Sequence, residues 1–515
     1  MRPPTKSVAW LVFLLTCLGV TLTTGRLHIR GDAGQMCNVA AAIGDHGWFD
    51  VPRARGDIVQ GPDNKFYSKY PLLTVLQCAP ALWMRALGRV ISGVNSTWEF
   101  FFLGVVPAIV TGLVALFFLL CSNELGFSLR LGAVGALLMV FTTPLWCYGR
   151  ELYSENLQAA LLLATLWTAL VGKRTLERRW FIASGVFSGL ALLSKFTLIV
   201  TPGFLVLMVL VDGPGWKRLS RCLWAGLLGL LPFLVVFLAY NYLRFGSPFE
   251  QGYSDARTVT FGFGTPLYSG LSGLLFSSGK SVFLYAPLLI AALFGLVPLY
   301  RRHKGAVLFI LCQSVLLFGL MAKWWSGLGD WAWGPRLVVP VFPLLLLGAL
   351  EAFAITDLPR RLAMGVLALA GFVVNLLGCV IDHSHYINIA GQVTHRGLQL
   401  ERAGGMIRDD LVIAHFVPEF SPPVGHYWLL DVYLTGWEPH HWTPWEGIHI
   451  PAWEMVPDPT PPFLNHWSDG SPAAWTVIVV GWTVVLLLSV ALALILRRAR
   501  ARRLDYAVPS ATGAA

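Results

Sequence analysis

Residues 101–120 read FFLGVVPAIVTGLVALFFLL, an apolar run without a single charged side chain. A helix of about 20 apolar residues is long enough to cross the roughly 30 Å hydrocarbon core of a bilayer. Similar apolar blocks recur along the chain, at 8–24, 97–120, 131–148, 152–171, 181–194, 196–211, 223–241, 282–300, 305–322, 337–354, 362–381 and 474–496. We therefore predict an all-α polytopic membrane protein with about 12 transmembrane helices. The two blocks around Lys195 are either two short spans or one kinked hairpin.

The composition agrees with a membrane protein and gives no sign of a nucleic-acid partner. Of 515 residues, 56% are hydrophobic and 13% are charged, whereas soluble domains carry about 25% charged residues. The net charge of +10 is explained by basic cytoplasmic loops, since lysine and arginine concentrate on that side of a membrane. We expect membrane lipids as partners and no nucleic acid.

The basic residues favour one side of the predicted bundle. Lysines and arginines gather in alternate short loops and in the tail, at 173–179, 217–221, 301–304, 360–361 and 497–503. By the positive-inside rule, this pattern predicts cytoplasmic termini and an even number of spans. The long segments 25–96 and 382–473 then lie outside.

Three regions follow from this topology. Residues 1–381 form a multi-span module, 382–473 form an external segment that faces the acceptor or the membrane interface, and 474–515 hold the last span and a basic tail. The first external loop, 25–96, is too long for a simple connector and is predicted to be structured, with short amphipathic helices after Pro71. The later external segment contains a strand-like stretch from Asp409 to Phe416.

Two cysteines of the first external loop, Cys37 and Cys78, can pair if that side of the membrane is oxidising. The other cysteines lie in or beside apolar blocks, where a cysteine usually serves as a small buried hydrophobe.

The first external loop also carries an acid close to the membrane. Asp32 lies in Arg-Gly-Asp-Ala-Gly at 30–34, shortly after the first apolar block. A carboxylate at this level can meet a membrane-borne and a water-borne substrate together, which suits a general base. An acid after a span is also commonly an ordinary solvated loop residue, and both interpretations stay open.

The same loop continues with Gly47-Trp48 and then with Asn64-Lys65-Phe66-Tyr67-Ser68-Lys69-Tyr70-Pro71-Leu72-Leu73. This order resembles the first external loop of GT-C glycosyltransferases, above all protein O-mannosyltransferases and bacterial lipid A aminoarabinose transferases. The resemblance implies transfer of a sugar from a polyprenyl-phosphate carrier to an acceptor outside the cytoplasm, in a bacterial inner (plasma) membrane. It matches Asp32 to the loop acid and Lys69 to the basic residue that meets the carrier phosphate, with Tyr67 beside it as a substrate-binding residue.

Further segments extend the resemblance over roughly residues 8–350. Glu151 and Glu155 open the fourth apolar block, where the family often places a second acid, and Gly189-Leu-Ala-Leu-Leu-Ser-Lys195 resembles a conserved span end. Trp333-Gly334-Pro335-Arg336 resembles a loop pattern of bacterial members. Ala33 stands where many relatives have another acid, so a two-acid metal site is in doubt, and we predict no protein metal ligand or certain cofactor. A role for a divalent metal stays open, as does metal binding by His383 and its neighbouring histidines.

The chemistry implied by the resemblance calls for fixed cations, because displacing a phosphate builds negative charge on the leaving group. Arginine binds phosphate bidentately and lysine acts as a point charge. The candidates are Lys69, Arg257, Lys280, Arg336 and, at the end of its span, Lys195. For Lys195 the alternative is a side chain that extends to the interface, and Glu151 can simply pair with Arg150.

The sequence thus predicts an inverting glycosyltransferase in which Asp32, Glu155 and Glu151 are the catalytic candidates. Its partners would be a polyprenyl-phosphate-linked sugar and a glycan, lipid or protein acceptor. A transporter or lipid-linked-sugar flippase is the alternative, and it would place charges and internal repeats at the bilayer midplane. A non-catalytic scaffold would not need the acid and lysines of the external edge.

Overall fold

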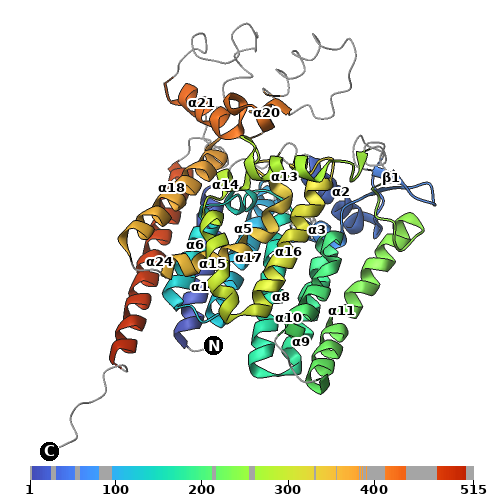
Figure 1. Cartoon of the computed structure of the whole chain (residues 1–515). Coiled ribbons are helices and arrows are strands. Elements are labelled where there is room, and N and C mark those ends of the chain that lie inside the picture. The colour runs from blue at the N-terminus through green and yellow to red at the C-terminus, as the bar shows by residue number, and fades with distance from the viewer. Residues whose placement is uncertain are drawn as a thin grey trace, which may run out of the picture.

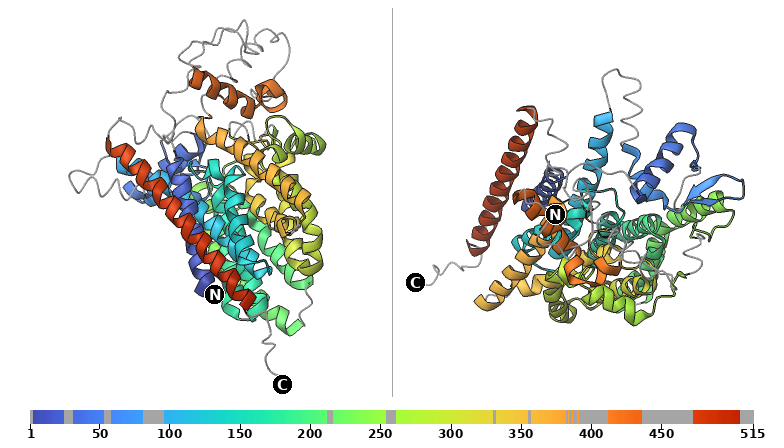
Figure 2. Two further views of the ribbon diagram at one scale, coloured as in Figure 1. Left: turned by 90° about the vertical axis from the view of Figure 1, so that its left-hand side faces the viewer. Right: turned by 90° about the horizontal axis from the view of Figure 1, so that it is seen from above.

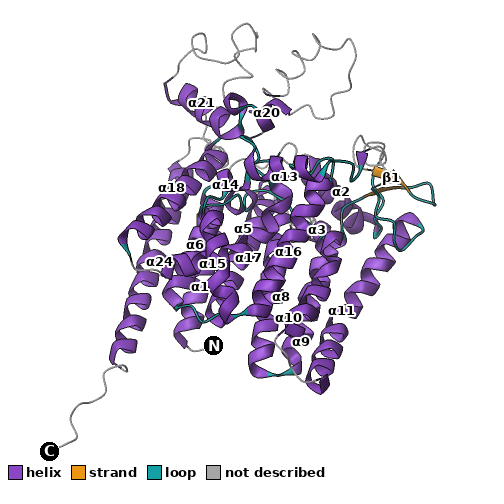
Figure 3. Cartoon of the chain, in the orientation of Figure 1, coloured by secondary structure: helices purple, strands orange, loops and turns teal. Residues whose placement is uncertain are grey.

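The computed structural model describes residues 3–24, 31–52, 58–80, 96–211, 216–253, 261–329, 332–354, 357–381, 412–435 and 472–505, with positions 383, 386 and 390. These residues are almost entirely helical or in loops (Figure 3). Their one sheet is a two-stranded antiparallel pair, β1 (Ile58–Gln60) and β2 (Phe66–Ser68), in which Val59 faces Tyr67. The predicted all-α polytopic architecture is confirmed.

Seven helical segments within the described residues are long and apolar enough to cross a membrane. They lie in α1 (Pro3–Leu22), α5 (Ser96–Glu124), α11 (Trp216–Phe245), α16 (Lys304–Lys323), the 3₁₀ turn η2 (Arg336–Val341) with α17 (Phe342–Ala354), α18 (Leu358–Val380) and α24 (Pro472–Asp505). The other predicted blocks fall on α6 (Leu129–Phe141), α7 (Leu145–Tyr148), α8 (Glu155–Thr175), α9 (Arg178–Ser194), η1 (Phe196–Val200), α10 (Thr201–Val211), α14 (Val282–Tyr285) and α15 (Leu288–Arg302). The structure therefore does not establish the predicted number of about 12 spans.

One end of the bundle carries most of the described connecting structure (Figure 1). We call it the loop end, and it is formed by α2 (Gly31–His46), β1, β2, α3 (Leu72–Leu76), α13 (Leu267–Phe276) and α14, with α20 (Val412–Phe416), η3 (Pro418–Phe420) and α21 (Pro422–Thr435) beyond them. Helix α1 begins, and α24 ends, at the opposite end (Figure 1). The first loop is structured as predicted, with helices on both sides of the hairpin.

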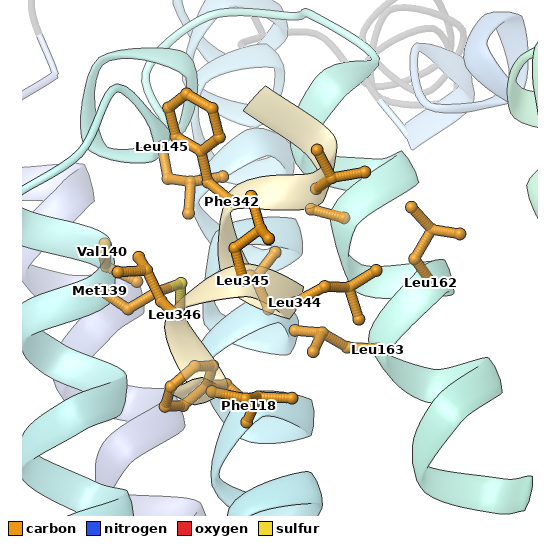
Figure 4. Close-up of a cluster of buried hydrophobic side chains, with 14 of the residues drawn as sticks. Phe118, Met139, Val140, Leu145, Leu162, Leu163, Phe342, Leu344, Leu345 and Leu346 are labelled. Carbon is orange, nitrogen blue, oxygen red and sulfur yellow. The ribbon is translucent and has the colours of Figure 1, made fainter. Parts of the chain in front are cut away.

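The core lies where α5, α6, α8 and α17 meet. Phe118, Met139, Leu163 and Phe342 are buried there (Figure 4). Lipid is as apolar as these side chains, so close packing rather than the hydrophobic effect holds such helices together. Helices α9 and α11 show how close that packing is, because a Cβ at Gly185 would lie 2.0 Å from the carbonyl oxygen of Gly226.

Helix α24 runs along the outside of the bundle and packs against α1 (Figure 2). Large apolar side chains on its outer face are exposed, as are those of α11 and α18; examples are Leu486, Leu228 and Leu369. A continuous apolar surface of this kind is expected where helices face lipid. The chain is an integral membrane protein.

Two local expectations can be compared with the structure. The helix breaks at Lys195, which has an extended backbone (φ −161°, ψ 126°) between α9 and η1. The strand-like stretch predicted from Asp409 to Phe416 is wrong for its described part, since Val412–Phe416 is helix α20. Four of these five residues are apolar and they do not alternate with polar ones, and such a short apolar run is compatible with one helical turn as well as with a strand.

Candidate active site

Three charged side chains from distant parts of the chain meet at the loop end. Arg336, the first residue of η2, donates from Nη2 to Oδ2 of Asp32 at 2.5 Å and from Nε to Oε1 of Glu155 at 2.9 Å. Asp32 lies in the first turn of α2, and Glu155 is the first residue of α8. One guanidinium therefore joins two carboxylates that are 123 positions apart in the sequence (155 minus 32).

The acid of the first loop is ionised at neutral pH. Its Oδ1 accepts a 2.5 Å hydrogen bond from the hydroxyl of Tyr70. Burial by itself would raise the pKa of Asp32, but the charge of Arg336, the bonds from Tyr70 and Arg336, and the charge of Lys195 outweigh it and lower the pKa to about 2. Asp32 is thus held as a carboxylate by the cations and the phenol around it.

The two carboxylates differ in their access to solvent. The side chain of Asp32 is 29% exposed and that of Glu155 only 1% exposed, with Arg336 between them at 16%. The ring of Tyr153 covers one face of the guanidinium, 4.0 Å from its carbon, as in a cation–π contact. Oε2 of Glu155 is buried without a hydrogen-bond partner among the described residues. Glu155 is therefore the inner anchor of Arg336, and Asp32 is the outer one.

Two lysines lie close to this ion cluster. Lys195, at the break between α9 and η1, has Tyr253, Glu155, Arg336 and Asp32 as its electrostatic neighbours. The ammonium of Lys69 lies 5.2 Å from the centre of the Tyr253 ring. Tyr253 thus links the two lysines, and positive charge extends from Arg336 along this edge of the bundle.

The backbone that carries Lys69 and Tyr70 is held by a buried arginine. Arg244, near the end of α11, is 2% exposed. Its Nη1 donates to the carbonyl oxygens of Ser68 at 2.5 Å and Tyr70 at 3.4 Å, and its guanidinium lies 3.7 Å from the centre of the Tyr240 ring. Arg244 therefore fixes the main chain on both sides of Lys69.

Arg336 is positioned by the loop immediately before it. The ammonium of Lys280 is fully buried and donates to the carbonyl oxygens of Ala332 (2.6 Å) and Gly334 (3.3 Å). Gly334 has a φ of +66°, and a Cβ there would lie 2.8 Å from the ring of Tyr285. Only glycine fits this left-handed turn without strain. The direction in which the chain enters η2 is thus fixed by the turn and by Lys280.

A second contact reaches this loop from His383 and from helix α21. The ring of His426 on α21 lies 4.4 Å from that of Trp333, and Nε2 of His426 lies 3.0 Å from Nδ1 of His383. The main-chain oxygen of Trp333 accepts a hydrogen bond from the hydroxyl of Tyr148. Residues 383 and 426 therefore pack on the loop that precedes Arg336.

The structure separates the predicted site residues into groups. Asp32, Glu155 and Arg336 are in direct contact, with Lys195 and Lys69 nearby. Lys280 and Tyr67 are fully buried, and the Tyr67 hydroxyl donates to Asp63 at 2.6 Å and accepts from Trp48 at 3.0 Å. Glu151 is exposed, and Arg257 lies outside the described residues.

Sequence reasoning missed Tyr70, Arg244 and Tyr253. Tyr70 belongs to the loop motif, but no pattern in the sequence assigns it a role, and nothing in the sequence near Arg244 or Tyr253 distinguishes them from ordinary interfacial residues. A metal site also lacks support in the described part of the chain, where no group of three or more histidine, cysteine, aspartate or glutamate side chains is arranged to hold an ion.

The chain has recognisable relatives over part of its length. Residues 80–241, less than half of the chain, match the family model of dolichyl-phosphate-mannose-protein mannosyltransferases. This segment contains Glu155 and Lys195 but neither Asp32 nor Arg336. No curated protein sequence matches the chain.

Two solved structures resemble this chain at low sequence identity. The structure of ArnT from Cupriavidus metallidurans in the apo state has 16% sequence identity and a TM-score of 0.45, covering 81% of this chain and 75% of that one. The archaeal oligosaccharyltransferase AglB from Archaeoglobus fulgidus, in complex with an inhibitory peptide and a dolichol-phosphate, has 14% identity and a TM-score of 0.49, covering 79% and 60%.

The family match confirms the resemblance for residues 80–241, a part of the stretch of roughly 8–350 over which the sequence suggested it. Over residues 80–241 the chain is similar to the dolichyl-phosphate-mannose-protein mannosyltransferases, which supports a membrane glycosyltransferase of the GT-C superfamily.

Proposed function

We propose that this protein transfers a sugar from a polyprenyl-phosphate carrier to a hydroxyl of a glycan, lipid or protein acceptor at the external face of the membrane, with inversion at the anomeric carbon. One observation carries the proposal: Arg336 joins Asp32 and Glu155 at the loop end, beside Lys195. An acid and a set of cations in one place are what displacement of a phosphate by a hydroxyl requires.

The cations would hold the donor's phosphate. Arg336 offers a planar fork to phosphate oxygens, while Lys195 and Lys69 add point charges on the side of Tyr253. The carrier's lipid tail would lie against the apolar helices, so its phosphate would emerge at their ends. Negative charge that develops on the leaving phosphate would then meet fixed cations, which is the main source of rate enhancement in such reactions.

Asp32 would be the general base. The acceptor hydroxyl attacks the anomeric carbon and forms the new C–O bond, while the bond from that carbon to the phosphate oxygen breaks and its electron pair leaves with the phosphate. The hydroxyl proton passes to a carboxylate oxygen of Asp32. A single in-line displacement of this kind inverts the anomeric centre. Glu155, buried beneath Arg336, would keep the guanidinium in position.

The proposed orientation rests on the distribution of basic residues. Clusters such as 173–179 and 301–304 lie away from the loop end, and α1 begins and α24 ends on their side (Figure 1). The positive-inside rule assigns this side to the cytoplasm. We propose the inner (plasma) membrane of a bacterium as the site of action.

The test is transfer by purified protein in liposomes, using a panel of polyprenyl-phosphate sugars and a mixture of hydroxyl acceptors. We expect covalent sugar–acceptor product from one donor, and a loss of at least about 100-fold with Asp32→Asn, the range of a missing general base. Glu124→Gln is the matched control, because it removes a carboxylate paired with the exposed Arg174, away from the site. Undiminished transfer by Asp32→Asn would remove the proposed base. Movement of the donor across the bilayer without product would indicate a flippase instead.

A further inference from the structure

The ion cluster that would bind the donor is already internally neutralised. Arg336 uses Nη2 for Asp32 and Nε for Glu155, and Tyr153 covers one face of its guanidinium. Of the three guanidinium nitrogens of Arg336, only Nη1 has no hydrogen-bond partner among the described residues. The cation best suited to a phosphate is therefore largely occupied by carboxylates of the protein itself.

The two carboxylates are not equally replaceable. Glu155 is 1% exposed and lies beneath the guanidinium, whereas Asp32 is 29% exposed. A phosphate must approach from the accessible side, and a bidentate contact would use the end of the guanidinium formed by Nη1 and Nη2. Nη2 is the nitrogen that holds Asp32. Two anions competing at this nitrogen repel each other, so the outer contact is the one that gives way.

We infer that the donor's phosphate displaces Asp32 from Arg336, so that donor binding itself frees the catalytic base; the inference rests on the proposed function. The ion pair seen here is the resting state of the site. Tyr70, which donates to the other oxygen of Asp32, keeps the released carboxylate at the site, and Glu155 keeps Arg336 in place.

The displacement has a chemical purpose. A carboxylate paired with a guanidinium is a poor proton acceptor, and the pKa of Asp32 is about 2 in this arrangement. A general base works best when its pKa approaches the working pH. Loss of the guanidinium contact and the arrival of a negatively charged phosphate both raise the pKa of Asp32. The base therefore gains strength only when the sugar that it serves is bound.

Binding of the phosphate alone tests this inference without knowledge of the sugar. The measurement is the affinity of the purified protein for undecaprenyl phosphate in detergent, with undecaprenol as the control that lacks phosphate. Because Asp32 competes for Arg336, Asp32→Asn should tighten binding by about three- to tenfold, the scale of a partly exposed ion pair. Glu124→Gln, at the far ends of α5 and α8, should leave the affinity unchanged.

A cycle of variants separates competition for Arg336 from simple repulsion between Asp32 and the phosphate. Arg336→Gln combined with Glu155→Gln removes the cation without leaving a buried charge unpaired. In the Glu155→Gln background, Asp32→Asn should still tighten binding. In the Glu155→Gln/Arg336→Gln background the tightening should be clearly smaller, because only the repulsion between Asp32 and the phosphate is left to relieve.

Three results would contradict the inference in different ways. Unchanged or weaker binding by Asp32→Asn would overturn the displacement, and so would equal tightening with and without Arg336. Failure of the wild-type protein to bind undecaprenyl phosphate above undecaprenol would overturn the proposed function itself. Thermal unfolding of each variant in the same detergent shows whether it is folded when its affinity is measured.

Discussion

The contact between Asp32 and Arg336 makes a quantitative prediction about stability. Asparagine at position 32 keeps the shape of the side chain and can still accept from Tyr70, but it has no charge for Arg336. The pKa of Asp32 is lowered from 3.8 to about 2 in the folded protein. Each pKa unit corresponds to about 1.36 kcal/mol, so the ionised carboxylate contributes about 2 kcal/mol to the free energy of unfolding at pH 7.

This contribution has a defined pH dependence. Because the folded pKa is depressed, the stabilisation is fully present above the unfolded pKa of 3.8 and is lost as the pH falls through about 2. Near pH 3 about half of it should remain. Asp32→Asn should therefore be less stable than wild type by about 2 kcal/mol at neutral pH, and the two proteins should converge in acid.

Reversible denaturation in mixed micelles, repeated from pH 7 to pH 3, measures this difference. Glu124→Gln removes another carboxylate that is paired with an arginine, Arg174, whose side chain is 63% exposed. It shows how much an ion pair with a solvent-exposed arginine contributes to stability, which is commonly below about 1 kcal/mol. Equal stability of wild type and Asp32→Asn at pH 7, or a difference that grows in acid, would refute the electrostatic reasoning.

Three further outcomes are expected. Lys280→Met should lower the free energy of unfolding by about 2–4 kcal/mol, since two buried carbonyl groups lose a charged donor. It should also reduce turnover more than donor affinity. An effect on undecaprenyl phosphate affinity alone would instead make Lys280 a direct ligand. Arg244→Gln should weaken donor binding about tenfold, a loss of roughly 1.4 kcal/mol of binding free energy, because the main chain around Lys69 is no longer held. Unchanged affinity would show that this support is dispensable. The Sγ atoms of Cys37 and Cys78 lie 3.4 Å apart, so protein assembled with this loop in an oxidising compartment should carry a disulfide between them. Mass spectrometry after alkylation without reduction detects this bond. Free thiols at both positions would contradict the prediction.

Much of the fold was predictable because membrane insertion imposes simple rules. The apolar run at 101–120 falls inside α5, and the basic clusters lie at one end of the bundle. Short sequence patterns predicted the secondary structure less well where the packing of the segment decides between helix and strand. The hairpin of β1 and β2 has only three residues per strand, which is too short for an alternating pattern to stand out. Residues 412–416 form a short apolar run, and such a run does not distinguish a strand from a helix.

The candidate site was predictable in its residues more than in its geometry. The position of Asp32 after the first span and the family resemblance of the segments with Glu155 and Arg336 predict the three residues, but their contact depends on how separate helices pack. Lys280 illustrates the limit. The sequence makes Lys280 a candidate cation for the carrier phosphate, whereas the buried ammonium binds the carbonyl groups of the protein's own loop. Single-sequence patterns do not reveal which partner a buried cation finds.

The sequence distances within the ion cluster have a consequence for biosynthesis. Arg336 lies 304 positions after Asp32 and 181 after Glu155. Since membrane proteins are made and inserted from the N-terminus, both carboxylates reach the bilayer edge long before their cation is synthesised. The site cannot exist in any nascent chain shorter than its first 336 residues, and the segment with a recognisable family match cannot assemble it alone. A late folding step therefore joins the two halves of the chain, and it completes the site at the same moment.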